Sequence, residues 1–262
     1  MSPDLKLRVL SALVLAPIVL GAVWLGGLPF QIMLGIAVVL AAYEWAHLTC
    51  GPEWYLNAVL IAGTALAAML ATVTDNLNSL GWIILAGTAL SGGLGWIRGQ
   101  ELRWRLLGVP YISLGPTAMV WLRDQDGVGL TLIVWLLLVI WAMDIGAYFA
   151  GRAIGGPKLA PRASPNKTWA GLIGGMVSAG VVGGAVALAG SLGPAWMLAV
   201  LAALVGAWSQ AGDIAESMVK RHFGVKDMSN LIPGHGGILD RVDGLLFAAP
   251  AMILVVKGLD LV

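Results

Sequence analysis

The chain has 262 residues, of which 59% are hydrophobic and only 11% are charged, with a formal net charge of +1 and a mean hydropathy of +0.88. Soluble domains are about 45–50% apolar and about 25% charged, and here the apolar excess extends over the whole length, which predicts a polytopic membrane protein rather than a singly anchored one. The small net charge argues against nucleic acid as a partner, and a single cysteine, Cys50, excludes an intramolecular disulfide framework.

Nine segments approach the length of about 20 apolar residues that a membrane-spanning helix needs. The first is long enough to be a retained helix rather than a cleaved signal peptide. Pro110 and Pro116 in the short fifth segment allow either a kinked span or a re-entrant segment. The predicted spans are 7–26, 28–48, 56–74, 80–97, 109–122, 128–150, 168–189, 193–212 and 238–258.

The distribution of lysine and arginine predicts the orientation of these spans, because such residues concentrate on the cytoplasmic side. If the N-terminus is cytoplasmic and all nine segments cross, outside segments carry only Arg123 and Lys257. A re-entrant fifth segment would remove this asymmetry, so the count favours a true span. The twelve cations predicted to lie inside are Lys6, Arg8, Arg98, Arg103, Arg105, Arg152, Lys158, Arg162, Lys167, Lys220, Arg221 and Lys226.

The acidic residues of the predicted spans lie at one membrane depth. Glu44, Asp144 and Asp213 lie at or near the inner ends of the second, sixth and eighth spans, and Asp240 and Asp243 open the ninth from the inside. Ionisable groups at such positions are costly unless they have partners. The sequence therefore predicts an all-α membrane protein with a polar cavity that faces the cytoplasm.

Two pairs of carboxylates follow a helical spacing. Asp213 and Glu216 share a helix face with Lys220, and Asp240 shares another with Asp243. Several carboxylates close together cannot all ionise unless cations intervene, and Mg²⁺ takes such oxygen ligands together with substrate phosphates. The alternative interpretation is an ion pair at a helix end, for example between Glu216 and Lys220.

A glycine-rich loop separates these two helices. Gly236 and Gly237 permit a positive φ and a close approach of backbone N–H groups to an anion, and His235 offers a hydrogen-bond donor to a phosphate or a base. A histidine in a glycine turn that donates only to the protein itself is the alternative.

A second polar segment extends from Asp144 to Thr168. Four cations, at 152, 158, 162 and 167, follow the carboxylate of Asp144. Residues 164–168 predict a rigid turn that ends at the start of the seventh helix, where free N–H groups favour anions. Alternatively, these cations only set the topology and contact anionic lipid head groups.

Both segments resemble those of a known family, the phosphatidate cytidylyltransferases or CDP-diacylglycerol synthases. The downstream resemblance is dense over about thirty residues, whereas the first hundred or so carry no matched motif. The downstream residues are Ser217, Lys220-Arg221, Lys226-Asp227, Pro233-Gly234-His235-Gly236-Gly237 and Asp240-Arg241-x-Asp243. The upstream residues are Asp144, Gly151-Arg152 and the Ser-Pro-x-Lys-Thr run at 164–168.

The resemblance implies that CTP and phosphatidate react to give CDP-diacylglycerol and pyrophosphate, with Mg²⁺ required, more than one cation expected and a monovalent ion possible. It also implies a site in the cell (inner) membrane and a possible homodimer. No linker is long enough to split the chain, which predicts one transmembrane domain over 1–262, with N-terminal helices without a matched motif in 1–108 and catalytic helices and loops in 109–262. The implied catalytic residues are Asp213, Asp240, Asp243, Lys220 and Arg221, and the implied metal ligands are Asp213, Asp240, Asp243 and Asp144. The implied substrate-binding residues are Asp144, Ser164, Lys167, Thr168, Ser217, Lys226, Asp227, His235, Gly236, Gly237 and Arg241.

Two other functions fit parts of the pattern. An ion-coupled transporter would also place acids within spans, but transporter sites tend to lie near the midplane between internal repeats, and no repeat is evident here. A related enzyme that acts on another lipid phosphate or lipid alcohol would share most of the signature. The roles of Glu44 and Glu216 stay open, because an ion pair at a helix end could explain either residue.

Overall fold

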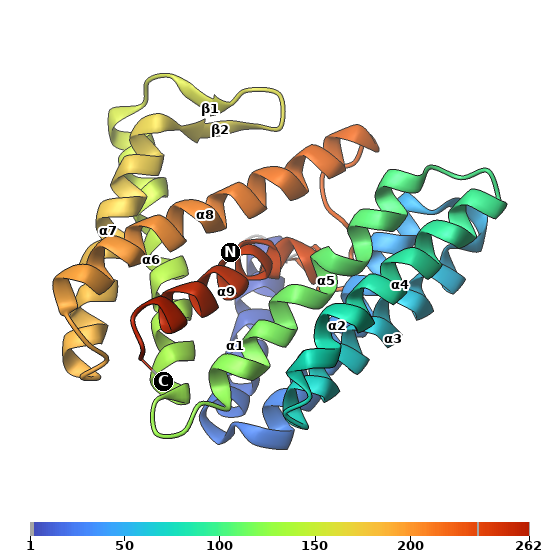
Figure 1. Ribbon diagram of the computed structural model, residues 1–262. Helices are drawn as coiled ribbons and strands as arrows, with labels where there is room; N and C mark the ends of the chain where they lie inside the picture. The colour runs from blue at the N-terminus through green and yellow to red at the C-terminus, as the bar shows by residue number, and fades with distance from the viewer. Residues whose placement is uncertain (1–2, 235, 262) are drawn as a thin grey trace. The chain divides into compact units, whose positions relative to one another are not determined.

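The computed structural model describes residues 3–234 and 236–261. Nine α-helices, one 3-10 helix and a two-stranded sheet lie in this part of the chain (Figure 1). The helices are α1 (Pro3–Leu25), α2 (Gly27–Thr49), η1 (Gly51–Glu53), α3 (Trp54–Val73), α4 (Leu77–Ile97), α5 (Leu102–Arg123), α6 (Gly129–Ile154), α7 (Trp169–Ala189), α8 (Ala195–His222) and α9 (Leu239–Gly258). The strands are β1 (Lys158–Ala160) and β2 (Ser164–Thr168).

Six of the helical segments are long and apolar enough to cross a membrane: α2, α3 with η1, α4, α6, α7 and α8. Helix α1 has an apolar stretch over Leu13–Leu25, and α5 and α9 carry charged residues in their end turns. The multi-pass, helical character predicted from composition is therefore confirmed. Nine crossings stay a prediction.

Helix α5 differs most from its predicted bounds, because it begins at Leu102 rather than 109 and continues through Pro110 and Pro116. A 22-residue helix is roughly 33 Å long, about the thickness of a bilayer core. Its first turn contains Arg105, which the sequence placed with the cations of a loop. This side chain is only 1% exposed, and its guanidinium donates to the amide oxygens of Asn57 and Gln100. Hydrogen bonding thus allows a buried arginine inside the helix.

The segment before α7 is a hairpin rather than a turn alone. β1 pairs antiparallel with β2, with Lys158 opposite Thr168 and Ala160 opposite Ser164. Ser164 precedes a proline, which favours an extended backbone. The prediction that this segment ends at the start of the seventh helix is confirmed, because the Thr168 hydroxyl caps α7 by accepting from the Gly171 N–H at 3.0 Å.

The chain forms two compact units. Unit 1 comprises Met1–Asp124 and Asp227–Val242, and unit 2 comprises Gln125–Lys226 and Asp243–Val262. In unit 1, α2 to α5 pack together around buried residues such as Ile61 and Ile112. In unit 2, α7 packs against both α6 and α8.

Glycines permit the close helix packing in unit 2. A Cβ at Gly175 would lie 2.7 Å from the Met143 carbonyl oxygen, and one at Gly171 would lie 2.9 Å from that of Ala147. Small residues at such positions are a common means of helix association in membranes. This contact holds the polar end of α6, which carries Asp144, against the start of α7.

Candidate functional site

A continuous chain of polar contacts in unit 2 joins three segments that are distant in sequence. The Lys167 ammonium on β2 lies 2.5 Å from Asp213 Oδ2 and donates to Gln210 Oε1 at 2.7 Å, both on α8. Gln210 Nε2 in turn donates to Asp144 Oδ1 on α6, also at 2.7 Å. One ammonium and one amide therefore hold two carboxylates in a fixed relation.

These residues line a cavity of about 540 Å³ at the polar end of α6, α7 and α8. The charged residues of its lining are Asp144, Arg152, Lys158, Lys167 and Asp213. Three cations thus exceed two carboxylates, and Thr168 brings the start of α7 to the same wall. Positive side chains and helix N–H groups both favour an anionic ligand such as a phosphate.

Gln210 is the functional candidate in this cavity that the sequence did not single out. It is only 6% exposed and bonds to both charged partners described above. The sequence feature that could have identified it is a side-chain amide three residues before Asp213, in an otherwise apolar span. Because positions i and i+3 share a helix face, that spacing directs both side chains the same way.

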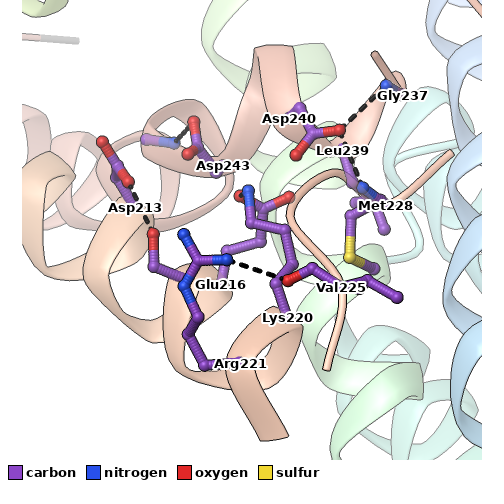
Figure 2. Close-up of polar contacts among 12 residues, drawn as sticks. Asp213, Glu216, Lys220, Arg221, Val225, Met228, Gly237, Leu239, Asp240 and Asp243 are labelled. Carbon is purple, nitrogen blue, oxygen red and sulfur yellow. Dashed lines mark hydrogen bonds and ion pairs between the residues drawn. The ribbon is translucent and has the colours of Figure 1, made fainter. Parts of the chain in front are cut away.

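The last turns of α8 carry a helix-end ion pair. Lys220 and Glu216 lie on the same helix (Figure 2), with Lys220 Nζ 2.8 Å from Glu216 Oε2, and both side chains are largely buried. The ion-pair interpretation left open by the sequence thus describes these two residues. Ser217 donates to Asp213 Oδ1 at 3.3 Å, and Arg221 donates to the carbonyl of Val225 at 3.0 Å.

Asp243 belongs to the same unit as Asp213. Helix α8 approaches the backbone of α9 so closely at Gly212 that a Cβ there would lie 2.7 Å from the Asp243 carbonyl oxygen. The Asp243 carboxylate accepts the N–H of Gly244 at 2.7 Å. Glycine at 212 therefore permits the close approach of α8 to Asp243 of α9.

Asp240 lies in unit 1 and organises the glycine-rich loop. Its Oδ2 accepts the N–H of Met228 at 2.9 Å and that of Gly237 at 2.8 Å (Figure 2). The N–H of Gly236 donates to the Ile232 carbonyl at 3.2 Å. In this conformation both glycine N–H groups expected to face an anion are engaged by the protein, and a φ of +86° explains glycine at 236.

The other predicted site residues are spread over the surface of their units. Ser164 begins β2, while Lys226, Asp227 and Arg241 are exposed in the loop after α8 and the first turn of α9. His235 lies outside the described residues.

Across residues 3–234 and 236–261, no three histidine, cysteine, aspartate or glutamate side chains are gathered as a metal site. The donor chemistry in unit 2 nevertheless fits a cation, because Lys167 already places a positive charge against a carboxylate oxygen of Asp213 and an amide oxygen of Gln210. Oxygen ligands of this kind are those that Mg²⁺ takes. These residues therefore fit magnesium by donor type.

Comparison with known proteins gives consistent matches over nearly the whole chain. The Cytidylyltransferase family pattern matches residues 6–259. A phosphatidate cytidylyltransferase of Brucella suis biovar 1 (strain 1330) is 41% identical over 255 residues, which cover 96% of this chain and 93% of the relative. Proteins of the same name from Pseudomonas aeruginosa and Staphylococcus saprophyticus are 42% and 31% identical, covering 94% and 95% of this chain and 94% and 97% of those relatives.

Proposed function

Because this chain belongs to the cytidylyltransferase family, we propose that it transfers the cytidylyl group of CTP to phosphatidate in phospholipid synthesis. A phosphate oxygen of phosphatidate attacks the α-phosphorus of CTP, the bond from that phosphorus to the β-phosphate bridging oxygen breaks, and pyrophosphate leaves. The products are CDP-diacylglycerol and pyrophosphate. The lipid phosphate is already an anionic nucleophile, so the site must mainly align the reactants and neutralise crowded negative charge.

The observation that carries this proposal is the cavity of unit 2, where three cations and the start of α7 surround two carboxylates. Arg152, Lys158 and Lys167 would bind the triphosphate. The Lys167 ammonium would exchange its contact with Asp213 for a phosphate oxygen, since a lysine side chain is a flexible point charge. Gln210 would keep that ammonium near the cavity while the partner changes.

Magnesium belongs to the same proposal. In unit 2, Asp144, Asp213 and Asp243 would hold one or more cations, and a monovalent ion could join them. Asp240, in unit 1, stays a ligand predicted from the sequence. Bound Mg²⁺ would neutralise charge on the attacking and leaving oxygens. Lys220 and Arg221 would assist once released from the contacts they make in this conformation.

The proposed setting is the cell (inner) membrane, crossed nine times, with the N-terminus and the cavity on the cytoplasmic side. The excess of cations in predicted inner segments supports this orientation. CTP would then enter from the cytoplasm while the lipid phosphate stays at the interface. Homodimer formation is part of the proposal and can be measured by light scattering in detergent.

The deciding experiment incubates purified protein with labelled CTP, phosphatidate and Mg²⁺, with and without chelator, and separates the lipid products. We expect labelled CDP-diacylglycerol and an equal amount of pyrophosphate, both abolished by chelator. Competing reactions with lipid alcohols and other lipid phosphates define the acceptor. Label transferred preferentially to one of these, or no transfer by folded protein, would contradict the proposal.

A further inference from the structure

We propose that Glu44, which lies on α2 and far in sequence from the signature, is a positioning residue for the reaction because it fixes the start of α9. This inference rests on the proposed function, in which Asp240 of the same helix takes part. Glu44 is only 1% exposed. Among the described residues, no lysine or arginine forms an ion pair with it.

The partners of Glu44 come from the loop that leads into α9. Its Oε1 accepts the hydroxyl of Ser229 at 2.5 Å and the N–H of Ile238 at 2.8 Å. Its Oε2 accepts the N–H of Leu239, the first residue of α9, at 2.9 Å. A carboxylate at this position satisfies N–H groups that a helix start leaves without intrahelical partners, and its charge suits the helix dipole.

Asp240 completes this arrangement from within α9. The N–H of Gly237 donates to Asp240, and the next two N–H groups along the chain, at 238 and 239, donate to Glu44. Three consecutive backbone donors are thus bound by two carboxylates. The position of the Asp240 side chain therefore depends on a loop that Glu44 holds.

The glycine at 237 is explained by the same contact. A Cβ there would lie 2.6 Å from Glu44 Oε1 and 2.8 Å from Oε2, closer than side-chain atoms approach. Gly237 has no need of an unusual φ, so the requirement is space for the carboxylate. The glutamate on α2 and this signature glycine consequently form one structural pair.

Glu44→Gln tests the inference, because glutamine keeps the size and one acceptor oxygen but turns an N–H₂ group toward a backbone donor. We expect kcat to fall about tenfold or more, while KM for CTP changes less than about threefold. Hydrogen exchange should become faster at 238 and 239, and at Gly237 as its contact with Asp240 loosens, without faster exchange in α3 to α5. Thr72→Val is the matched control, since it removes a buried hydroxyl of α3 that bonds only within its own helix.

The exchange measurement separates this inference from the proposed function. If the wild-type protein transfers no cytidylyl group, the proposed function fails, yet exchange at 238 and 239 still reports whether Glu44 holds the loop. Unchanged exchange in Glu44→Gln, or faster exchange with wild-type kcat, would overturn the inference. If Glu44→Gln fails to fold, Ser229→Ala is the second variant, because it removes one donor to Glu44. It must show a smaller decrease in kcat and a smaller increase in hydrogen exchange at 238 and 239.

Discussion

Gln210 provides the sharpest test of the cavity, because it bonds to Lys167 and Asp144 at once. Gln210→Met keeps the volume of the side chain but removes both hydrogen bonds, each of which is 2.7 Å long. Gln210→Glu keeps an acceptor for Lys167 and removes the donor to Asp144. The two variants therefore separate loss of the whole link from loss of one half.

The expected magnitude follows from the contacts that remain. Hydrogen bonds to charged groups contribute about 1.5–3 kcal/mol each, so removal of both sets an upper limit of roughly 3–6 kcal/mol. In this variant Lys167 retains its ion pair with Asp213, and the exposed carboxylate of Asp144 can bind water instead of Gln210. These remaining contacts offset much of the free energy lost with the two hydrogen bonds. We therefore expect about 1.5 kcal/mol, or roughly a tenfold lower kcat/KM for CTP, in Gln210→Met.

Gln210→Glu should raise the KM for CTP more than Gln210→Met does, because it adds a negative charge to a cavity that must accept a triphosphate. The assay is the initial rate of labelled CTP incorporation into lipid over a range of CTP concentrations. Ser209→Ala is the control, since this buried neighbour donates only to a carbonyl of its own helix. A Gln210→Met enzyme within about twofold of wild type would refute the reasoning.

Asp240→Asn and Asp243→Asn should each abolish CTP incorporation while membrane insertion persists, and near wild-type turnover in both would defeat their assignment as metal ligands. Lys167→Ala should raise the KM for CTP, because it removes a cation from the cavity; an unchanged CTP dependence would leave this residue a topological role. Thr168→Ala should lower the free energy of unfolding by about 1 kcal/mol, because the cap of α7 is lost, and an unchanged denaturation midpoint in detergent would contradict this.

The helices were largely predictable because a membrane span must be long and apolar. The predicted span 28–48 corresponds to α2 at Gly27–Thr49, and 80–97 to α4 at Leu77–Ile97. The fifth span was too short because the charge of Arg105 indicated a loop. The burial of Arg105 depends on hydrogen bonds to the side-chain amides of Asn57 and Gln100, and a hydropathy profile does not predict such tertiary hydrogen bonds.

The charged residues that line the cavity of unit 2 could be singled out from the sequence. Asp144, Lys167 and Asp213 come from separate segments and do line one cavity. The sequence missed Gln210 because a neutral amide gives no charge signal. The sequence did not indicate a role for Glu44. The two backbone N–H groups that donate to it lie 194 and 195 residues away, and every residue except proline has such a group, so the residue type gives no signal.

The bonding partner of each carboxylate distinguishes two groups of acids. Some hold the structure in place, and others can release their partner and bind a ligand instead. Glu44 and one oxygen of Asp240 bind backbone N–H groups, which cannot leave without unfolding the loop. Asp213 instead binds the ammonium of Lys167, a flexible side chain on a cavity wall. A cation can therefore replace the Lys167 ammonium at Asp213, and a phosphate can bind the ammonium so released, at little structural cost. Loss of the Asp240 carboxylate should disturb the loop as well as any bound metal, so Asp240→Asn should accelerate exchange at Gly237, whereas Asp243→Asn should not.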